Sequence, residues 1–256
     1  MSGVIHCDDL THTFDGIAAV DRATLTIAAG EFVGLVGPSG AGKTTLLRTL
    51  NGFVTPSAGR AIVAGRDVGA LNGRDLRRHR RQVGMIYQRF HLVERATAFH
   101  NALSGAAGRL SPWRTWLSTA PPGERVRALD ALARVGLADR WAQRVDTLSG
   151  GQRQRVAIAR TVVQDPQIVL ADEPVASLDP ASAERVLTLL ADLARKDGRT
   201  VVASLHQVEL AGRFCDRIIA LDQGRVVIDA PARQVTAEQW GTLYRLEHDV
   251  LAEEAV

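Results

Sequence analysis

The sequence predicts an α/β fold in which a parallel-type sheet carries two additions, an antiparallel β part near the N-terminus and an inserted helical part. Short apolar runs at 32–36, 167–171 and 200–204 are typical of strands buried on both faces of a sheet. Residues 4–30 alternate apolar and polar, which indicates antiparallel strands. Residues 89–162 are rich in alanine, arginine and leucine with little strand signal, so we expect them to be helical.

The alternating N-terminal segment predicts three short strands, at 4–7, 10–14 and 23–27, with turns at Asp15-Gly16 and Ala29-Gly30. Phe14 ends the second of these strands. An aromatic ring there can stack on a nucleotide base. The spacing alone favours a phenylalanine in the core.

The strand at 32–36 leads into a glycine-rich turn and a helix that extends to about Asn51. Residues 37–44 match G-x-x-x-x-G-K-T, the phosphate-binding loop pattern. Its glycines take backbone angles closed to other residues, so that successive N–H groups point into one concavity, and the helix adds its positive N-terminal end. Lys43 brings a charge to the β- and γ-phosphates, and the Thr44 hydroxyl reaches Mg²⁺. The strand–loop–helix context favours this interpretation over a chance lysine in a glycine-rich turn.

After the helix, the pattern predicts a turn at 56–59, a strand at 60–64, a turn at 65–67, a basic helix at 75–81 and a strand at 83–87. Gln88 follows that last strand. A polar residue at the carboxyl end of a strand in an open α/β sheet faces the ligand crevice. The arginines of 74–81 are better explained as a solvated helix face than as a nucleic-acid site.

In the helical part, residues 97–107 and 122–135 predict two helices, and residues 139–144 continue helically. Residues 109–123 lie between the two helices and predict an irregular loop with three prolines. This loop contains Trp113 and Trp116, which either face a partner or form a local hydrophobic staple; the sequence leaves both open.

Residues 148–152, Leu-Ser-Gly-Gly-Gln, precede an amphipathic helix predicted at 153–164. Ser149 stands at the N-cap position, and the two glycines let backbone N–H groups come close to a ligand. The pattern fits a second phosphate site and also an ordinary capped helix.

The strand at 167–171 ends in Asp172 and Glu173. Paired carboxylates at the carboxyl end of a buried strand suit Mg²⁺ binding together with a general base. A capped turn at 177–180 opens a helix predicted at 181–196, and the strand at 200–204 ends near His206, where an imidazole can contact a γ-phosphate. A hairpin of 217–221 and 225–229 and a short peripheral helical tail from Ala230 complete the pattern.

The composition fits a chain with a sizeable core and no membrane span. The 256 residues are 46% hydrophobic, and no apolar run reaches about 18 residues. The first residues lack the basic and apolar stretches of a signal peptide. Cys7 and Cys215 have no metal-type spacing and are expected to be reduced thiols of a cytosolic protein. The net charge of +3 suits a nucleic acid or an anionic membrane surface.

Taken in order, these motifs resemble the ATP-binding subunit of ABC transporters: the phosphate loop, Gln88, residues 148–152, 168–173 and 177–179, and His206. The resemblance covers residues 4–230, and Leu-Ser-Gly-Gly-Gln between a phosphate loop and Asp-Glu is highly specific to that family. It implies one ATP-binding domain over 1–256, with a P-loop NTPase (RecA-like) core at 4–88 and 162–230, a helical subdomain at 89–161 and a C-terminal tail at 231–256. Residues 103–110, 128–140, 171–180 and 204–211 look similar to the phosphonate-importer branch.

The resemblance also implies a role for each motif residue. The nucleotide-binding set resembles the Walker A loop plus an adenine-stacking aromatic: Gly37, Pro38, Ser39, Gly40, Ala41, Gly42, Lys43, Thr44, Thr45 and Phe14. Ser149, Gly151 and Gln152 resemble the signature residues that contact ATP held by the opposite subunit, and Asp179 resembles a residue of the dimer interface. The implied Mg²⁺ site uses Thr44, Gln88 and Asp172. Glu173 resembles the base that polarises the attacking water, with Lys43, Gln88 and His206 as further catalytic residues.

The implied cofactors are ATP and Mg²⁺, and the implied assembly is a head-to-tail homodimer with two ATP molecules between its subunits. Integral-membrane permease subunits and an extracytoplasmic solute-binding protein would complete it, without nucleic acid, at the cytoplasmic face of the inner membrane. The implied function is ATP hydrolysis that energises phosphonate uptake across the cytoplasmic membrane. An importer of phosphite, another phosphorus oxyanion or a polar amino acid is the alternative within the family. An ABC ATPase acting on DNA or the ribosome, and a nucleotide-binding regulator without hydrolysis, are the alternatives outside transport; Glu173 argues against the regulator.

Overall fold

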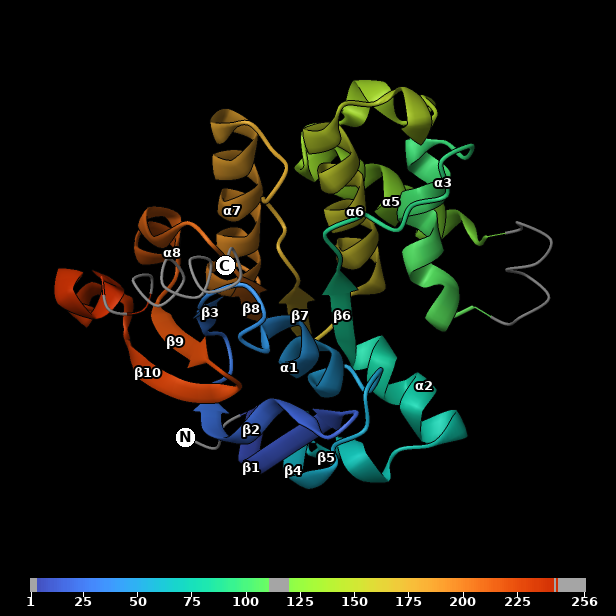
Figure 1. The fold of residues 1–256 in the computed structure, drawn as a ribbon. Helices are drawn as coiled ribbons and strands as arrows, with labels where there is room; N and C mark the ends of the chain where they lie inside the picture. The colour runs from blue at the N-terminus through green and yellow to red at the C-terminus, as the bar shows by residue number, and fades with distance from the viewer. Residues whose placement is uncertain (1–3, 111–119, 242, 244–256) are drawn as a thin grey trace.

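Two β-sheets and a group of helices make up the fold in Figure 1, a computed structural model that describes residues 4–110, 120–241 and 243. The larger sheet has the strand order β10-β9-β3-β8-β7-β6. Its strands are β3 (Phe32–Val36), β6 (Val83–Ile86), β7 (Ile168–Ala171), β8 (Thr200–Ser204), β9 (Arg217–Asp222) and β10 (Arg225–Pro231). Neighbouring strands run parallel except β10, which pairs with β9 in antiparallel fashion. The predicted α/β class is confirmed.

The register of the larger sheet places the carboxyl ends of four strands at one edge. Ile86 pairs with Ala171, Ala171 with Ala203, and Ala203 with Gly34. Strands β3, β6, β7 and β8 are buried along their whole length, as continuous apolar runs are in parallel sheets covered on both faces. The residues that directly follow these four strands therefore lie at the same edge of the sheet.

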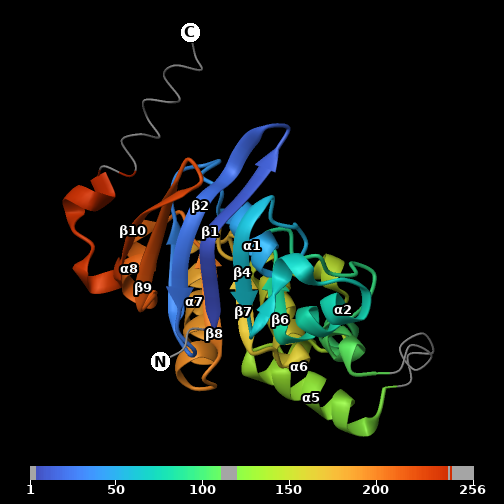
Figure 2. The same cartoon turned by 90° about the horizontal axis from the view of Figure 1, so that it is seen from below.

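The smaller sheet is antiparallel, with the order β2-β1-β4-β5. Its strands are β1 (Ile5–Phe14), β2 (Ile17–Ile27), β4 (Ala58–Val63) and β5 (Arg66–Asp67). The prediction of three short N-terminal strands was wrong, because β1 and β2 form one long ribbon, visible in Figure 2. Asp9 and Arg22 have positive φ, at irregularities that interrupt the apolar–polar alternation without ending the strands.

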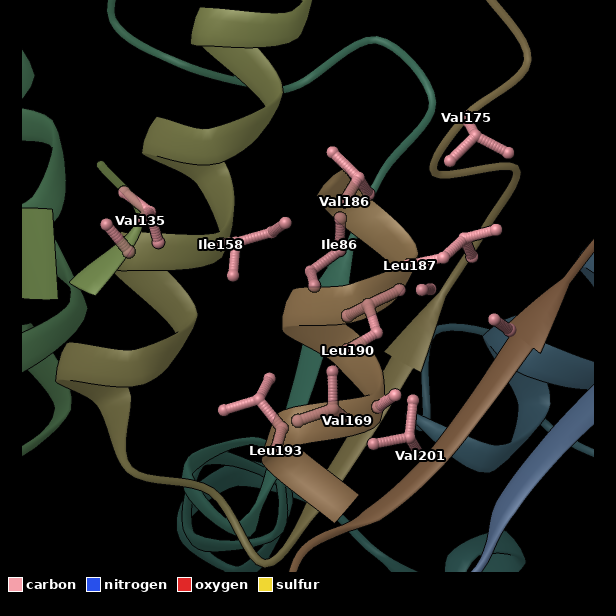
Figure 3. Packing of buried hydrophobic residues seen from close by; sticks show 14 of the residues in the cluster. Ile86, Val135, Ile158, Val169, Val175, Val186, Leu187, Leu190, Leu193 and Val201 are labelled. Carbon is pink, nitrogen blue, oxygen red and sulfur yellow. The ribbon is translucent and has the colours of Figure 1, made fainter. Parts of the chain in front are cut away.

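Two hydrophobic cores lie on opposite faces of the larger sheet, since side chains alternate along each strand. Val169 and Val201 belong to one core, and their neighbours Leu170 and Val202 belong to the other. Helix α7 (Pro180–Arg195) covers the first face, and Figure 3 shows its Leu190 close to these two valines. Helix α1 (Lys43–Leu50) fills the second core between the two sheets.

Every element described between residues 89 and 161 is helical, and these helices form the group at the upper right of Figure 1. They are α3 (Ala98–Leu103), α5 (Pro122–Arg134), α6 (Gly150–Gln164) and the 3₁₀ turns Ser104–Gly108, Ala138–Arg140 and Val145–Thr147. Helix α6 begins at Gly150, three residues before the predicted start, because Ser149 caps it directly. Residues 111–119 of the predicted proline- and tryptophan-containing loop lie outside the described residues.

The remaining helices are α2 (Gly73–Gln82), which contains the predicted basic segment, and α8 (Val208–Phe214), which the sequence did not predict. The segment after β10 forms the 3₁₀ turn Ala232–Gln234 and a helical stretch at 237–241. It is less peripheral than expected, since Trp240 packs against the first core and Leu243 is buried in it. Residues 244–256 of the predicted tail lie outside the described residues.

The two cysteines are free thiols, one in each core. Cys7 lies on β1 in the core between the sheets, and Cys215 follows α8 in the core under α7. Burial raises the pKa of each thiol to about 12. Both side chains therefore stay protonated and unreactive in the native state near pH 7.

Candidate functional site

The phosphate loop connects β3 to α1. Two of its glycines lie so close to neighbouring backbone that a larger residue would not fit. Gly37 has φ 141° and Gly42 has φ 98°, in the left-handed region that favours glycine. A Cβ atom at Gly37 would lie 2.0 Å from the Leu221 carbonyl oxygen, and one at Gly42 would lie 2.1 Å from that of Ala19. The loop therefore passes closely between the ends of β9 and β2.

Lys43 lies inside this loop. Its Nζ donates hydrogen bonds to the carbonyl oxygens of Gly37 and Pro38, both at 2.7 Å, and the side chain is buried. Helix α1 starts at Lys43 and has no side-chain cap at Gly42. The N–H groups of its first turn and the ammonium group together suit an anion, because the start of a helix carries positive partial charge.

Three hydroxyl and carboxylate groups meet where β7 and β8 end beside α1. Thr44 Oγ1 donates to Asp172 Oδ1 at 2.9 Å, and Ser204 Oγ donates to the same oxygen at 3.1 Å. The Ser204 hydroxyl also accepts a hydrogen bond of 2.8 Å from the Glu173 backbone N–H. Asp172 and Ser204 are both buried, so these contacts are largely protected from water.

Glu173 and His206 form a pair at the mouth of the site. His206 Nε2 lies 2.6 Å from Glu173 Oε1, and both side chains stay partly exposed. Glu173 has φ 47°, a left-handed backbone that is uncommon for a residue other than glycine. The geometry thus holds a carboxylate and an imidazole together, facing the phosphate loop.

A cavity of about 200 Å³ joins the loop to this pair. Most of the predicted phosphate-contacting residues line it: Ser39, Gly40, Ala41, Gly42, Lys43, Thr44, Thr45, Glu173 and His206, together with Ala19. Ligand pockets for whole small molecules usually measure about 300–1,000 Å³. The cavity therefore matches a group the size of a polyphosphate tail rather than an entire nucleotide.

Several predicted residues lie outside this cavity. Gln88 is exposed and follows β6 by two positions, and Phe14 is half-exposed at the end of β1, where its ring contacts His12 edge-on. Ser149 and Gln152 form a capping box at the start of α6: Gln152 Oε1 accepts from the Ser149 N–H at 2.9 Å, and Ser149 Oγ accepts from the Gln152 N–H at 3.3 Å. Gly151 lies close to Ser182, near the start of α7. A Cβ atom added to Gly151 would lie only 2.7 Å from the Ser182 hydroxyl oxygen.

Two residues of this site, Ser204 and Ala19, are not among those predicted from the sequence. Ser204 is the last residue of β8, and the available signal was its position, a hydroxyl at the end of a buried strand whose neighbours carry the site. Ala19 lines the cavity through the neighbouring ribbon, and nothing in its local sequence marks it.

Comparisons with known proteins agree with this geometry. The sequence profile of the family described as ABC transporter matches residues 20–176. A protein of Escherichia coli O157:H7 named phosphonates import ATP-binding protein PhnC is 48% identical, over 96% of this chain and 95% of its own length. The corresponding protein of Pseudomonas syringae pv. syringae, PhnC 2, is 46% identical over 97% of this chain and 92% of its own length.

Solved structures give the same result. The dimeric ATP-binding cassette MJ0796, bound to ADP and Pi in a post-hydrolysis state, matches with a TM-score of 0.80 and 34% identity, over 90% of this chain and 99% of the other. A further cassette, cbiO1 from Clostridium perfringens, matches with a TM-score of 0.82 over the whole chain at 24% identity, which supports the fold alone. From profile, relatives and fold together, the chain belongs to the ABC transporter family, as an ATP-binding subunit.

Proposed function

We propose that this chain hydrolyses ATP to energise the import of phosphonates across the cytoplasmic membrane. The observation that supports the substrate most directly is the identity of 46–48%, along almost the whole chain, with proteins named for phosphonate import. The cavity supports the ATPase chemistry, because it combines a phosphate loop with a carboxylate and an imidazole.

Within the cavity, we assign the phosphates to the loop and to Lys43. Glu173 is the group that polarises the attacking water, and His206 is its partner and a contact for the γ-phosphate. The hydrogen bond between Glu173 and His206 supports this pairing, because it joins the two side chains next to the loop. A carboxylate whose position is fixed by a second side chain suits general-base catalysis, which depends on a positioned proton acceptor.

The residues present fit Mg²⁺. The Thr44 hydroxyl and the Asp172 carboxylate already lie 2.9 Å apart, and both are oxygen donors of the kind that Mg²⁺ binds. No group of three or more histidine, cysteine, aspartate or glutamate side chains suited to a metal occurs in the described part of the chain. Mg²⁺ typically binds one or two carboxylates and completes its shell with water and phosphate, so the single carboxylate of Asp172 beside the Thr44 hydroxyl fits this ion. When bound, the ion would neutralise charge on the β- and γ-phosphates; Gln88 is our third proposed ligand.

The cavity and the start of α6 support a homodimer. Its volume suits a polyphosphate tail, while Ser149, Gly151 and Gln152 lie outside it at the start of α6. We propose that this helix start faces the ATP of a second copy, arranged head to tail, and that Phe14 stacks on the adenine. The dimeric state of the matching cassette MJ0796 supports this arrangement.

We place the dimer at the cytoplasmic face of the inner membrane as a peripheral component. None of the described helices has the length and apolar character needed to cross a bilayer. Its partners are integral-membrane permease subunits and an extracytoplasmic solute-binding protein, and Gln88 is our candidate for sensing the γ-phosphate and passing closure on to the permease. The division into a core of 4–88 and 162–230, a helical subdomain of 89–161 and a tail of 231–256 is part of the same proposal.

The decisive experiment measures ATP hydrolysis by the chain reconstituted with its proposed partners, the permease and the solute-binding protein. We expect stimulation by a phosphonate and no stimulation by phosphate or amino acids. Stimulation by another solute would support the role as a transport ATPase and contradict phosphonate as the substrate. Steady hydrolysis that no solute changes would count against transport.

A matched pair of variants tests the chemistry in the same complex. Glu173→Gln keeps the shape of the side chain and removes its basicity, so we expect ATP binding and dimerisation without turnover. Glu184→Gln on α7 is the control, because Glu184 lies outside the cavity and pairs with Arg213. Hydrolysis at the wild-type rate by Glu173→Gln would remove Glu173 from its assigned role.

A further inference from the structure

Ser204 joins the two acidic residues of the site through one buried hydroxyl. Its side chain is fully buried, donates to Asp172 Oδ1 at 3.1 Å and accepts from the Glu173 N–H at 2.8 Å. A serine hydroxyl has one proton to donate and two lone pairs, so these two contacts fix its rotation. The same hydroxyl therefore sets the position of the carboxylate of one residue and the backbone of the next.

The backbone contact matters because Glu173 is held in an unusual conformation. Its φ of 47° lies in the left-handed region, which costs a residue other than glycine free energy unless neighbouring groups hold it there. The Glu173 N–H donates to the Ser204 hydroxyl, and this hydrogen bond holds the turn. The direction of the Glu173 side chain, and hence its 2.6 Å contact with His206, depends on that backbone conformation.

Two hydroxyl groups donate to the Asp172 carboxylate, and they belong to different elements of the fold. Thr44 also donates to Asp172 Oδ1, but it belongs to the phosphate loop helix and is our proposed Mg²⁺ ligand. Ser204 belongs to β8, which is buried along its length and pairs with β7 on one side and β3 on the other. Ser204 is thus the hydroxyl partner of Asp172 that has no assigned task toward nucleotide or metal.

We propose that Ser204 is a positioning residue for hydrolysis, which aligns Asp172 and Glu173 as one unit. The inference rests on the roles proposed above for these two acids. It predicts that loss of the hydroxyl slows turnover while leaving ATP binding to the loop intact, because the Ser204 hydroxyl bonds Asp172 and Glu173. The loop lysine, Lys43, is instead held by the carbonyl oxygens of Gly37 and Pro38.

The test compares Ser204→Ala with Thr200→Val in the reconstituted complex. Thr200 is the matched control: it begins the same strand, is equally buried, and its hydroxyl accepts a hydrogen bond from the Gly30 N–H at 3.0 Å, far along β8 from the site. We expect Ser204→Ala to lower kcat by about 10-fold or more, with the KM for ATP within about threefold, because misalignment acts on the chemical step. Thr200→Val should leave both constants near those of the wild type, and Ser204→Thr, which keeps the hydroxyl, should recover most of kcat.

Equal kcat values for Ser204→Ala and Thr200→Val would overturn the inference, as would a rise in KM with kcat unchanged. Glu173→Gln in the same assay separates this inference from the proposed function: if that variant still turns over, the assignment of the base fails, whatever Ser204 does. Thermal unfolding confirms that each variant is folded. Should Ser204→Ala unfold, Ser204→Cys, with a similar size and a weaker hydrogen-bonding group, takes its place under the same criteria.

Discussion

Substitution of Gly42 by alanine should destabilise the protein far more than the same change at Gly40, two residues earlier in the loop. Both glycines have positive φ, 98° and 78°, so alanine at either position carries the left-handed backbone cost of about 1–2 kcal/mol, partly offset by a less flexible unfolded chain. At Gly40 the new methyl group meets nothing within 4 Å. At Gly42 it would lie 2.1 Å from the Ala19 carbonyl oxygen, so the backbone itself must move.

Forcing an atom into a packed site costs about 1–3 kcal/mol. We therefore expect Gly40→Ala to lose about 1 kcal/mol or less of unfolding free energy, and Gly42→Ala to lose about 1–3 kcal/mol more than that. At roughly 2–4 °C per kcal/mol for a chain of this size, the melting temperature of Gly42→Ala should lie about 2–12 °C below that of Gly40→Ala in calorimetry without nucleotide. Equal melting temperatures for the two variants would refute the argument that the close passage of the loop past β2 requires glycine at residue 42.

The other predictions concern a buried histidine, the first core and the loop lysine. Burial is the main cause that lowers the pKa of His79, whose Nε2–H donates a hydrogen bond to the Leu50 carbonyl oxygen. As the pH falls, His79 therefore becomes protonated in the unfolded chain before it does in the folded protein. Stability should be complete above about pH 6.5 and fall as the pH drops below it, and urea unfolding of His79→Gln should show a flatter dependence. Leu190→Ala, in a fully buried position, should cost about 2–5 kcal/mol in urea unfolding, whereas Leu129→Ala, 40% exposed, should cost less than about 1 kcal/mol; similar losses would contradict the assigned core. Lys43→Ala should weaken ATP binding in calorimetric titration, and an unchanged affinity would count against the phosphate-loop assignment.

Local patterns were sufficient to predict the phosphate loop and the strand ends. The G-x-x-x-x-G-K-T spacing and the buried strands that precede Asp172 and His206 are properties of a few consecutive residues. In a parallel sheet these strand ends lie at one edge, so their meeting in the cavity followed from the fold class.

Local sequence patterns could not predict contacts between segments that are far apart in the chain. Ser204 bonds residues 31 and 32 positions earlier in the chain, and no periodicity encodes that pairing. The long β1–β2 ribbon was divided in the prediction, because Asp9 and Arg22 break the alternation without breaking the strands. The start of α6 at Gly150 was missed for a different reason: glycine disfavours helix interiors, and the reciprocal hydrogen bonds of Ser149 and Gln152 override that preference.

The two buried thiols can be used to measure local opening of the native protein by thiol labelling. With pKa values of about 12, neither Cys7 nor Cys215 should react with a thiol reagent until the segment around it opens. Because one thiol lies between the two sheets and the other beneath α7, their labelling rates measure the opening of each core separately. Comparison of single-cysteine variants with and without ATP would then tell which face of the large sheet the nucleotide steadies.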